Sequence, residues 1–166
     1  MSTTEERLRG ALQAACARWE NVTEDEAARR PGPQAWSARE VLGHLIDSAS
    51  NNHGRFVRAR HVDHLDFDGY DQNAWIEVQG YSQTPWSELL VLWRAYNLHL
   101  ARVIELTPVE VREAPRARHA LERIAWKTVP QTSPATLGYF MDDYVGHLEH
   151  HLAQIDRTLA QVRAGR

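Results

Sequence analysis

The stretch SAREVLGHLIDSASNNHGRFVRAR, residues 37–60, carries the clearest helix signal in the chain. Ser37 and Glu40 have the spacing of a capping box, in which the serine hydroxyl caps free amides and the glutamate reaches back. Apolar side chains then recur at helical spacing, at Val41, Leu42, Leu45, Ile46, Ala49 and Phe56. The pattern predicts a long amphipathic helix with one face in a hydrophobic core.

Three other segments share this helical period, over residues 4–21, 84–106 and 133–162. Thr84-Pro85 and Ser133-Pro134 mark the starts of the last two, because proline suits the first helical turn. A short helix is expected near 71–78, and Thr107–Glu110 has a second capping-box pattern. No segment alternates polar and apolar residues convincingly, so the predicted fold class is all-α, a four-helix bundle.

Two connections between these helices are long, over residues 61–83 and 114–133. Neighbouring helices in a simple up-down bundle are joined by shorter loops, so at least one crossover connection is expected. The total length of 166 residues fits one domain, predicted to span residues 1–166.

The composition excludes several classes of protein. A formal net charge of -3 argues against a nucleic-acid-binding surface. The chain has no apolar run long enough for a membrane helix and no signal-peptide pattern, so we expect a cytoplasmic protein with no membrane partner. A single cysteine, Cys16, excludes an intrachain disulfide and a cysteine-based zinc finger.

Nine histidines are the unusual feature of the composition. In the last helix, at about 100° per residue, His151 and His147 fall on one flank of the apolar stripe, whereas His150 faces solvent. Two imidazoles one turn apart can reach the same metal ion. The spacing therefore favours a metal-binding pair, with a chance pair in a histidine-rich chain as the alternative.

The helix over 37–60 holds a polar stripe beside its apolar face, formed by His44, Asp47, Ser48, Asn51 and Arg55. Such a stripe has two interpretations. It is either the solvated side of the helix or the lining of a polar cleft in the bundle. The residues alone do not choose between the two.

Two segments together resemble the DinB/YfiT-like superfamily: WSAREVLGHLIDSASNNHGRF, residues 36–56, and YVGHLEHHLAQI, residues 144–155. Between them, YDQNAW at 70–75 is similar to an element of the YfiT branch. The resemblance implies a four-helix bundle with up-down-down-up topology, often a homodimer. It also implies one divalent ion, zinc or nickel, held by three histidines, which by position are His44, His147 and His151.

The resemblance further implies a metal-dependent hydrolase or a transferase that uses a low-molecular-weight thiol. Three neutral imidazoles leave a metal ion an open position, where either water or a thiol can be activated. We favour thiol transfer, because no obvious carboxylate base lies beside the histidine pair, and the thiol would come from outside the protein. The alternatives are hydrolysis by metal-bound hydroxide and a non-catalytic, stress-associated metal-binding bundle.

Four more residues are candidates at such a site. Asp47 and Asp143 each lie one turn from a proposed ligand, where a carboxylate could orient an imidazole N–H. Arg55 and Tyr70 would meet an anionic small-molecule substrate if the segment over 61–83 folds over the cleft.

Overall fold

The computed structural model describes residues 2–165, so the two end residues of the predicted 1–166 domain lie outside it. The helices in chain order are α1 (Thr4–Trp19), α2 (Glu24–Ala28), α3 (Ala38–Ala59), α4 (Gln72–Gln79), the 3-10 helix η1 (Tyr81–Gln83), α5 (Trp86–Glu105), α6 (Val109–Glu113), α7 (Leu121–Ile124) and α8 (Leu137–Ala164). Within residues 2–165, β-type pairing is limited to two isolated bridges. The predicted all-α class is confirmed.

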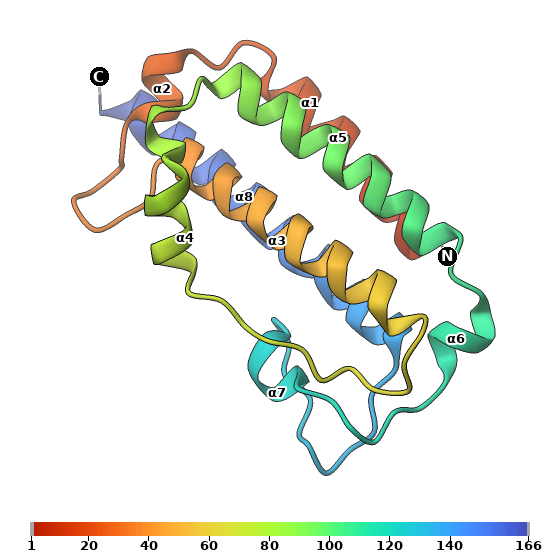
Figure 1. Ribbon diagram of the computed structural model, residues 1–166. Helices are drawn as coiled ribbons and strands as arrows, with labels where there is room; N and C mark the ends of the chain where they lie inside the picture. The colour runs from red at the N-terminus through yellow and green to blue at the C-terminus, as the bar shows by residue number, and fades with distance from the viewer. Residues whose placement is uncertain (1, 166) are drawn as a thin grey trace.

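The four long helices α1, α3, α5 and α8 form the bundle (Figure 1). Helices α3 and α5 run in the same direction, and His53 of α3 lies against His99 of α5. Helices α3 and α8 run antiparallel, with Phe56 near the end of α3 against Phe140 near the start of α8. Helix α1 runs parallel to α8, so the predicted up-down-down-up topology is confirmed.

Helix α3 lies at the centre of the bundle, and every residue from 41 to 49 is buried, polar side chains included. Its start has the predicted capping box, because the Ser37 hydroxyl accepts from the Glu40 amide at 3.3 Å while the Glu40 carboxylate accepts from the Ser37 amide at 2.8 Å. This burial shows that the polar stripe is not the solvated side of the helix. His44, Ser48 and Arg55 of the stripe line a cleft, whereas Asp47 and Asn51 do not.

Helix α8 begins at Leu137, three residues later than the Ser133-Pro134 pattern predicts. The backbone of Ala135 pairs with that of Arg116 through two hydrogen bonds of 2.8 and 3.1 Å, which hold this segment extended. Thr136 then caps the helix by accepting a hydrogen bond from the Tyr139 amide. A long-range backbone pairing has therefore overridden a local helix-start signal.

The second predicted capping box, at Thr107–Glu110, is also wrong. The Thr107 hydroxyl donates to the Val103 carbonyl at 2.8 Å and so closes the end of α5. Helix α6 starts after Pro108 without a side-chain cap. The threonine serves the preceding helix because the chain turns sharply between α5 and α6.

The first part of the connection over 61–83 lies beside the connection over 114–133 near the end of α3, and the rest runs along the bundle to α4 at its other end (Figure 1). Their backbones meet at the bridge between Leu65 and His119. The buried Arg116 guanidinium ties them further, donating to the carbonyls of Ala59 and Val62 at 2.8 and 3.2 Å. These contacts fix the segments that cover the polar side of α3.

Apolar side chains remain exposed on α5, where Val91 is 71% and Leu92 48% accessible. Surfaces of this kind are where a homodimer would form, and the expected homodimer stays a prediction. Among the described residues, no helix has both the length and the apolar character needed to cross a membrane.

Gly43 provides a test of the packing around α3. A Cβ atom at this position would lie 2.2 Å from the Tyr81 ring, so the ring and its 2.6 Å hydrogen bond to Asp47 would have to move. We expect Gly43→Ala to lower the free energy of unfolding by about 1–3 kcal/mol in urea denaturation.

Gly10 is the matched control, because it is also helical and a Cβ there would meet nothing within 4 Å. Gly10→Ala should raise the free energy of unfolding by roughly 0.5–1 kcal/mol through helix propensity. Equal stability changes in the two variants would show that Tyr81 does not pack on Gly43 as described.

Candidate metal centre

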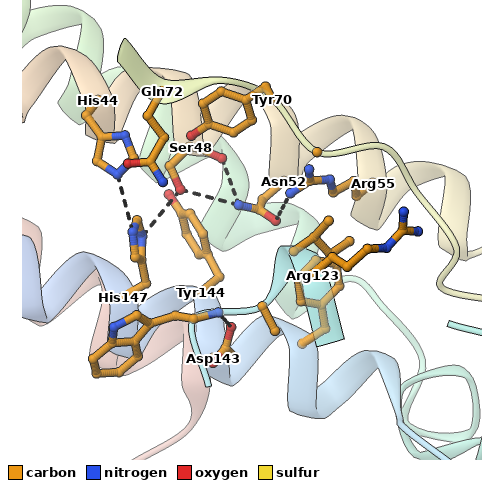
Figure 2. Close-up of a pocket in the computed structure, with 15 residues that line it drawn as sticks. His44, Ser48, Asn52, Arg55, Tyr70, Gln72, Arg123, Asp143, Tyr144 and His147 are labelled. Carbon is orange, nitrogen blue, oxygen red and sulfur yellow. Dashed lines mark hydrogen bonds between the residues drawn. The ribbon is translucent and has the colours of Figure 1, made fainter. Parts of the chain in front are cut away.

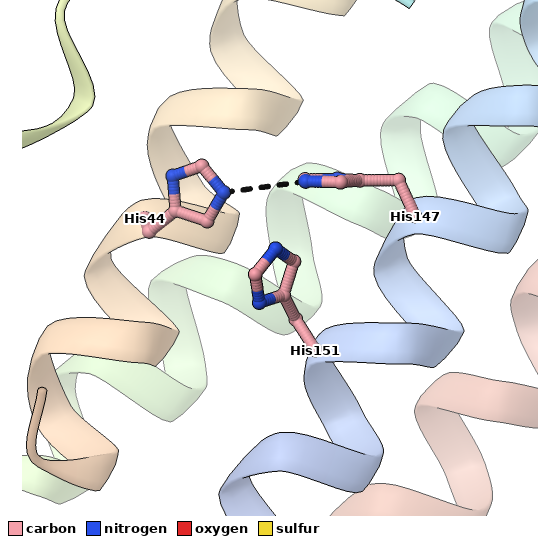
Figure 3. Close-up of side chains that lie close together, drawn as sticks. All are labelled: His44, His147 and His151. Atoms are coloured by element: carbon pink, nitrogen blue, oxygen red, sulfur yellow. Dashed lines mark hydrogen bonds between the residues drawn. The ribbon is translucent and has the colours of Figure 1, made fainter. Parts of the chain in front are cut away.

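Three histidines meet between α3 and α8: His44 from α3, and His147 and His151 from α8 (Figure 3). One ring nitrogen of each lies within 4.8 Å of the others, and the Nε2 atoms of His44 and His147 are 3.3 Å apart. Within residues 2–165, no other three His, Cys, Asp or Glu side chains come together in this way. The loop over 61–68, rich in His and Asp, forms no second cluster there.

The register of α8 explains which of its histidines reach the cluster. Tyr144 and Leu148 are buried and fix the face of α8 that packs into the bundle. His147 and His151 lie at the edge of that face and are partly buried, whereas His150 is exposed. The structure thus places these three histidines as the helical angles predict.

The cluster fits a divalent ion by its geometry. Nitrogen ligands at 2.0–2.1 Å from a tetrahedral zinc ion lie about 3.3–3.4 Å from one another. The 3.3 Å separation between the Nε2 atoms of His44 and His147, a distance at which the two nitrogens also share a hydrogen bond, matches this value. Three imidazole nitrogens are also a donor set that suits zinc and nickel.

The charge state of the rings also suits metal binding. Burial lowers the pKa of His44 to about 3, and repulsion from His151 adds to the effect. Burial, and then the other histidines, lower the pKa of His147 to about 3 as well. Burial also lowers the pKa of His151. All three rings are therefore neutral near pH 7, the form in which imidazole binds a metal.

Two side chains that the sequence did not suggest orient the rings of α8. Gln154 Oε1 lies 2.7 Å from His151 Nδ1, and because an amide oxygen only accepts, Nδ1 carries the hydrogen and Nε2 keeps its lone pair. Ser48 Oγ lies 3.5 Å from His147 Nδ1. Gln154 follows His151 by three residues, a helical spacing that could have revealed it.

His44 is held differently. Its Nδ1 is buried and has no hydrogen-bond partner among the described residues. The ring instead packs against Trp36, with ring centroids 5.5 Å apart. Packing against Trp36 and the contact of its Nε2 with His147 therefore orient this imidazole.

The two carboxylates expected to orient the histidines have other partners. Asp47 Oδ1 accepts from the Tyr81 hydroxyl at 2.6 Å and from Gln79 at 2.5 Å. Asp143 accepts from the backbone amides of Trp126 and Lys127 at 2.9 and 2.7 Å. Neither carboxylate hydrogen-bonds to a ligand imidazole within the described part of the chain, so Asp47 anchors η1 and Asp143 anchors the segment before α8.

The histidine cluster opens into a cavity of about 320 Å³ between α3, α8 and the two long connections (Figure 2). His44 and His147 form part of its wall, as do the two predicted substrate contacts, Arg55 and Tyr70. The connection over 61–83 therefore does fold over the cleft. Tyr70 stacks on Trp75, and burial raises the pKa of its phenol, so the hydroxyl stays protonated.

A chain of polar contacts runs along α3 from the cluster into the cavity (Figure 2). Asn52 Nδ2 donates to Ser48 Oγ at 3.3 Å, and Asn52 Oδ1 accepts from Arg55 Nη1 at 3.3 Å. The sequence pattern pointed to Asn51, but that side chain turns back to the Asp47 carbonyl. Asn52, which lies about 80° around the helix from His44, lines the cavity instead.

Comparison with known proteins agrees with this architecture. The family model of the DinB superfamily matches residues 7–155. The chain belongs to the DinB superfamily. A solved structure described as "YfiT from Bacillus subtilis is a probable metal-dependent hydrolase with an unusual four-helix bundle topology" matches 93% of this chain and 83% of its own, with a TM-score of 0.75 and 19% identity. No curated protein matches the chain in sequence.

At 19% identity, the likeness to YfiT shows the fold of this DinB superfamily member and not its activity. The matched region includes all three histidines of the cluster. The chain is thus a DinB superfamily protein with a candidate three-histidine metal site.

The low pKa values of His44 and His147 predict how the stability of the metal-free protein depends on pH. Below pH 6.5 the unfolded chain takes up protons on these rings, while the folded protein does not until its pKa of about 3. The free energy of unfolding should therefore fall as the pH falls between these values, by up to about 1.4 kcal/mol per pH unit for each ring. Urea denaturation in a chelator at several pH values measures this slope.

His44→Gln should reduce that slope, whereas His150→Gln, which changes an exposed neighbour, should leave it nearly unchanged. An identical slope in wild type and His44→Gln would contradict the buried, neutral state of His44.

Gln154 should affect metal affinity without being a ligand. Gln154→Leu removes the acceptor that fixes the His151 ring, so we expect zinc affinity to fall about 10- to 100-fold in a competition assay with a chromophoric chelator. Gln161→Leu, an exposed position two turns further along α8, is the control and should bind zinc like wild type.

Proposed function

We propose that this protein is a divalent-metal-dependent enzyme that transfers a low-molecular-weight thiol to a small electrophile. The observation that carries the proposal is the three-histidine cluster at the wall of a cavity in which no carboxylate of residues 2–165 hydrogen-bonds to the cluster. Asp143 lines that cavity, but backbone amides occupy its oxygens. A thiol needs only to lose its proton to become a nucleophile, whereas hydrolysis usually also needs a base to position water.

His44, His147 and His151 would hold the ion, for which zinc and nickel suit the donor set. When bound, the ion supplies Lewis acidity that lowers the pKa of a thiol or water at its open side. The neutral histidines add no negative charge, so that acidity is retained. Tyr70, with its protonated hydroxyl, and Arg55 face the cavity and would bind the rest of the small molecule.

Hydrolysis is the second candidate, and one observation favours it. The structurally similar YfiT is described as a probable metal-dependent hydrolase, and the same three histidines could activate water instead of a thiol. A non-catalytic metal-binding bundle would keep the cluster but show neither reaction.

The proposal is tested with protein purified without a histidine tag and loaded with zinc or nickel. We expect about one equivalent of metal and a metal-dependent conjugation of monochlorobimane with at least one cellular thiol. In this reaction the thiol sulfur forms a bond to carbon, chloride leaves with the electrons of the C–Cl bond, and the thiol proton goes to solvent. The increase in fluorescence measures the rate.

His44→Ala and His147→Ala should lose both the metal and the activity, while His150→Ala, an exposed neighbour on the same helix, should keep both. Less than about a tenth of an equivalent of metal in wild type, with unchanged thermal stability in His44→Ala, would refute the metal site. Metal binding with ester hydrolysis but no thiol conjugation would favour the hydrolase, and metal binding with neither would favour the binding protein.

A further inference from the structure

Arg55 is a buried cation that forms no salt bridge in the described chain, where the Asp68 carboxylate acts on it only from further away. Only 4% of the residue is exposed, and among residues 2–165 no carboxylate lies within 4 Å of its guanidinium. An unpaired charge removed from water is costly, so buried arginines are normally paired. Arg55 lines the cavity beside the histidine cluster, where a ligand could supply the missing negative charge.

The guanidinium is positioned but not saturated with hydrogen bonds. Nη1 donates to Asn52 Oδ1 at 3.3 Å and Nη2 donates to the Asp68 carbonyl at 2.5 Å. A guanidinium carries five N–H donors, so these two bonds leave three for another partner. Two neutral oxygens hold the group in place without cancelling its charge.

The other charged side chains at the cavity have partners. Arg123 lies at the rim with a 66% exposed side chain, and it pairs with Glu122 at 3.1 Å and Asp66 at 3.8 Å. Asp143 accepts from two backbone amides, which satisfy its oxygens without cancelling its charge. One guanidinium fork with free donors matches one carboxylate, whereas a phosphate dianion would require more cations.

We propose that the small molecule in this cavity carries a carboxylate that pairs with Arg55 while its thiol lies at the three histidines. The inference rests on the proposed function and adds the class and size of the thiol. The guanidinium reaches back to Asn52, eight residues after His44, which corresponds to about 12 Å of helix rise. A zigzag chain advances about 1.25 Å per bond, so roughly eight carbons and the thiol sulfur span about 10 Å, most of that distance.

Thiols of known length test this inference by binding rather than by activity. In cobalt-loaded protein, a coordinated thiol gives a sulfur-to-cobalt charge-transfer absorption, which can be titrated. We expect mercaptooctanoate, with its thiol at the far end from the carboxylate, to bind at least about tenfold more tightly than mercaptooctanol, since a charge-assisted pair with Arg55 forms only with the acid. The shorter mercaptopropionate should not show this advantage over mercaptopropanol.

Arg55→Gln should abolish the preference for the acid, and Arg55→Lys should restore part of it. Arg58→Gln is the matched control, because Arg58 lies one turn along α3 but is exposed and stacks over Phe67 outside the cavity. It should keep the full preference. The acid and alcohol comparison in wild type needs no variant, so it holds even if Arg55→Gln fails to fold.

Equal binding of the acid and the alcohol in wild type would overturn the role of Arg55 and leave the metal–thiol function intact. If no thiol changes the cobalt spectrum, the proposed function fails instead. Calorimetry with octanoate, which has the carboxylate but no thiol, then tests the anion site separately from the metal. Binding that is lost in Arg55→Gln but not in Arg58→Gln supports a carboxylate site, and no binding to wild type overturns it.

Discussion

The burial of a polar stripe on the central helix is the constraint on which the rest of this structure depends. His44, Ser48, Asn52 and Arg55 are all buried on α3, where each polar group needs a partner or it destabilises the fold. Ser48, Asn52 and Arg55 satisfy one another in series, and His147 extends the series to α8. A buried polar stripe of this kind needs packing partners that leave a cavity beside it. The antiparallel pairing of α3 with α8 and the cover formed by the two long connections provide those partners.

The topology explains why the cavity beside α3 is covered rather than open to solvent. In an up-down-down-up bundle, the chain between the parallel helices α3 and α5 must run back along the bundle, which a tight hairpin cannot do, and here it meets the connection between α5 and α8 on the way. Here those connections pair with each other at Leu65 and His119, and the buried Arg116 fastens them to the end of α3. The segment that carries Tyr70 and the turn before Trp126 therefore lie over the polar stripe. Shorter hairpins would leave His44 and Arg55 open to solvent, where the pKa of a histidine is not depressed by burial.

Much of the fold was predictable from local signals, because these signals act within one helix. The capping box at Ser37 and Glu40 and the helical angles of His147, His150 and His151 needed no knowledge of the neighbours. The predicted roles of Thr107 and Asn51 failed because each side chain bonds to a carbonyl four residues earlier, and the other failures depended on distant partners. The start of α8 moved because Ala135 pairs with Arg116, and the carboxylates of Asp47 and Asp143 were bound by η1 and by the segment before α8. The place of His44 in the cluster came from family resemblance, since its sequence surroundings fitted a solvated face equally well.

The contrast between the three rings bears on how such a centre releases and rebinds its ligands. His151 and His147 each have a hydrogen-bonding neighbour at Nδ1, whereas the Nδ1 of His44 has none among the described residues. A hydrogen bond at Nδ1 fixes the tautomer and the tilt of an imidazole whose Nε2 faces an ion. His44 is therefore the ring that is least restrained on its Nδ1 side. Because it also forms part of the cavity wall, any movement of His44 is coupled to the molecule that occupies the cavity, and metal affinity and ligand affinity should depend on each other.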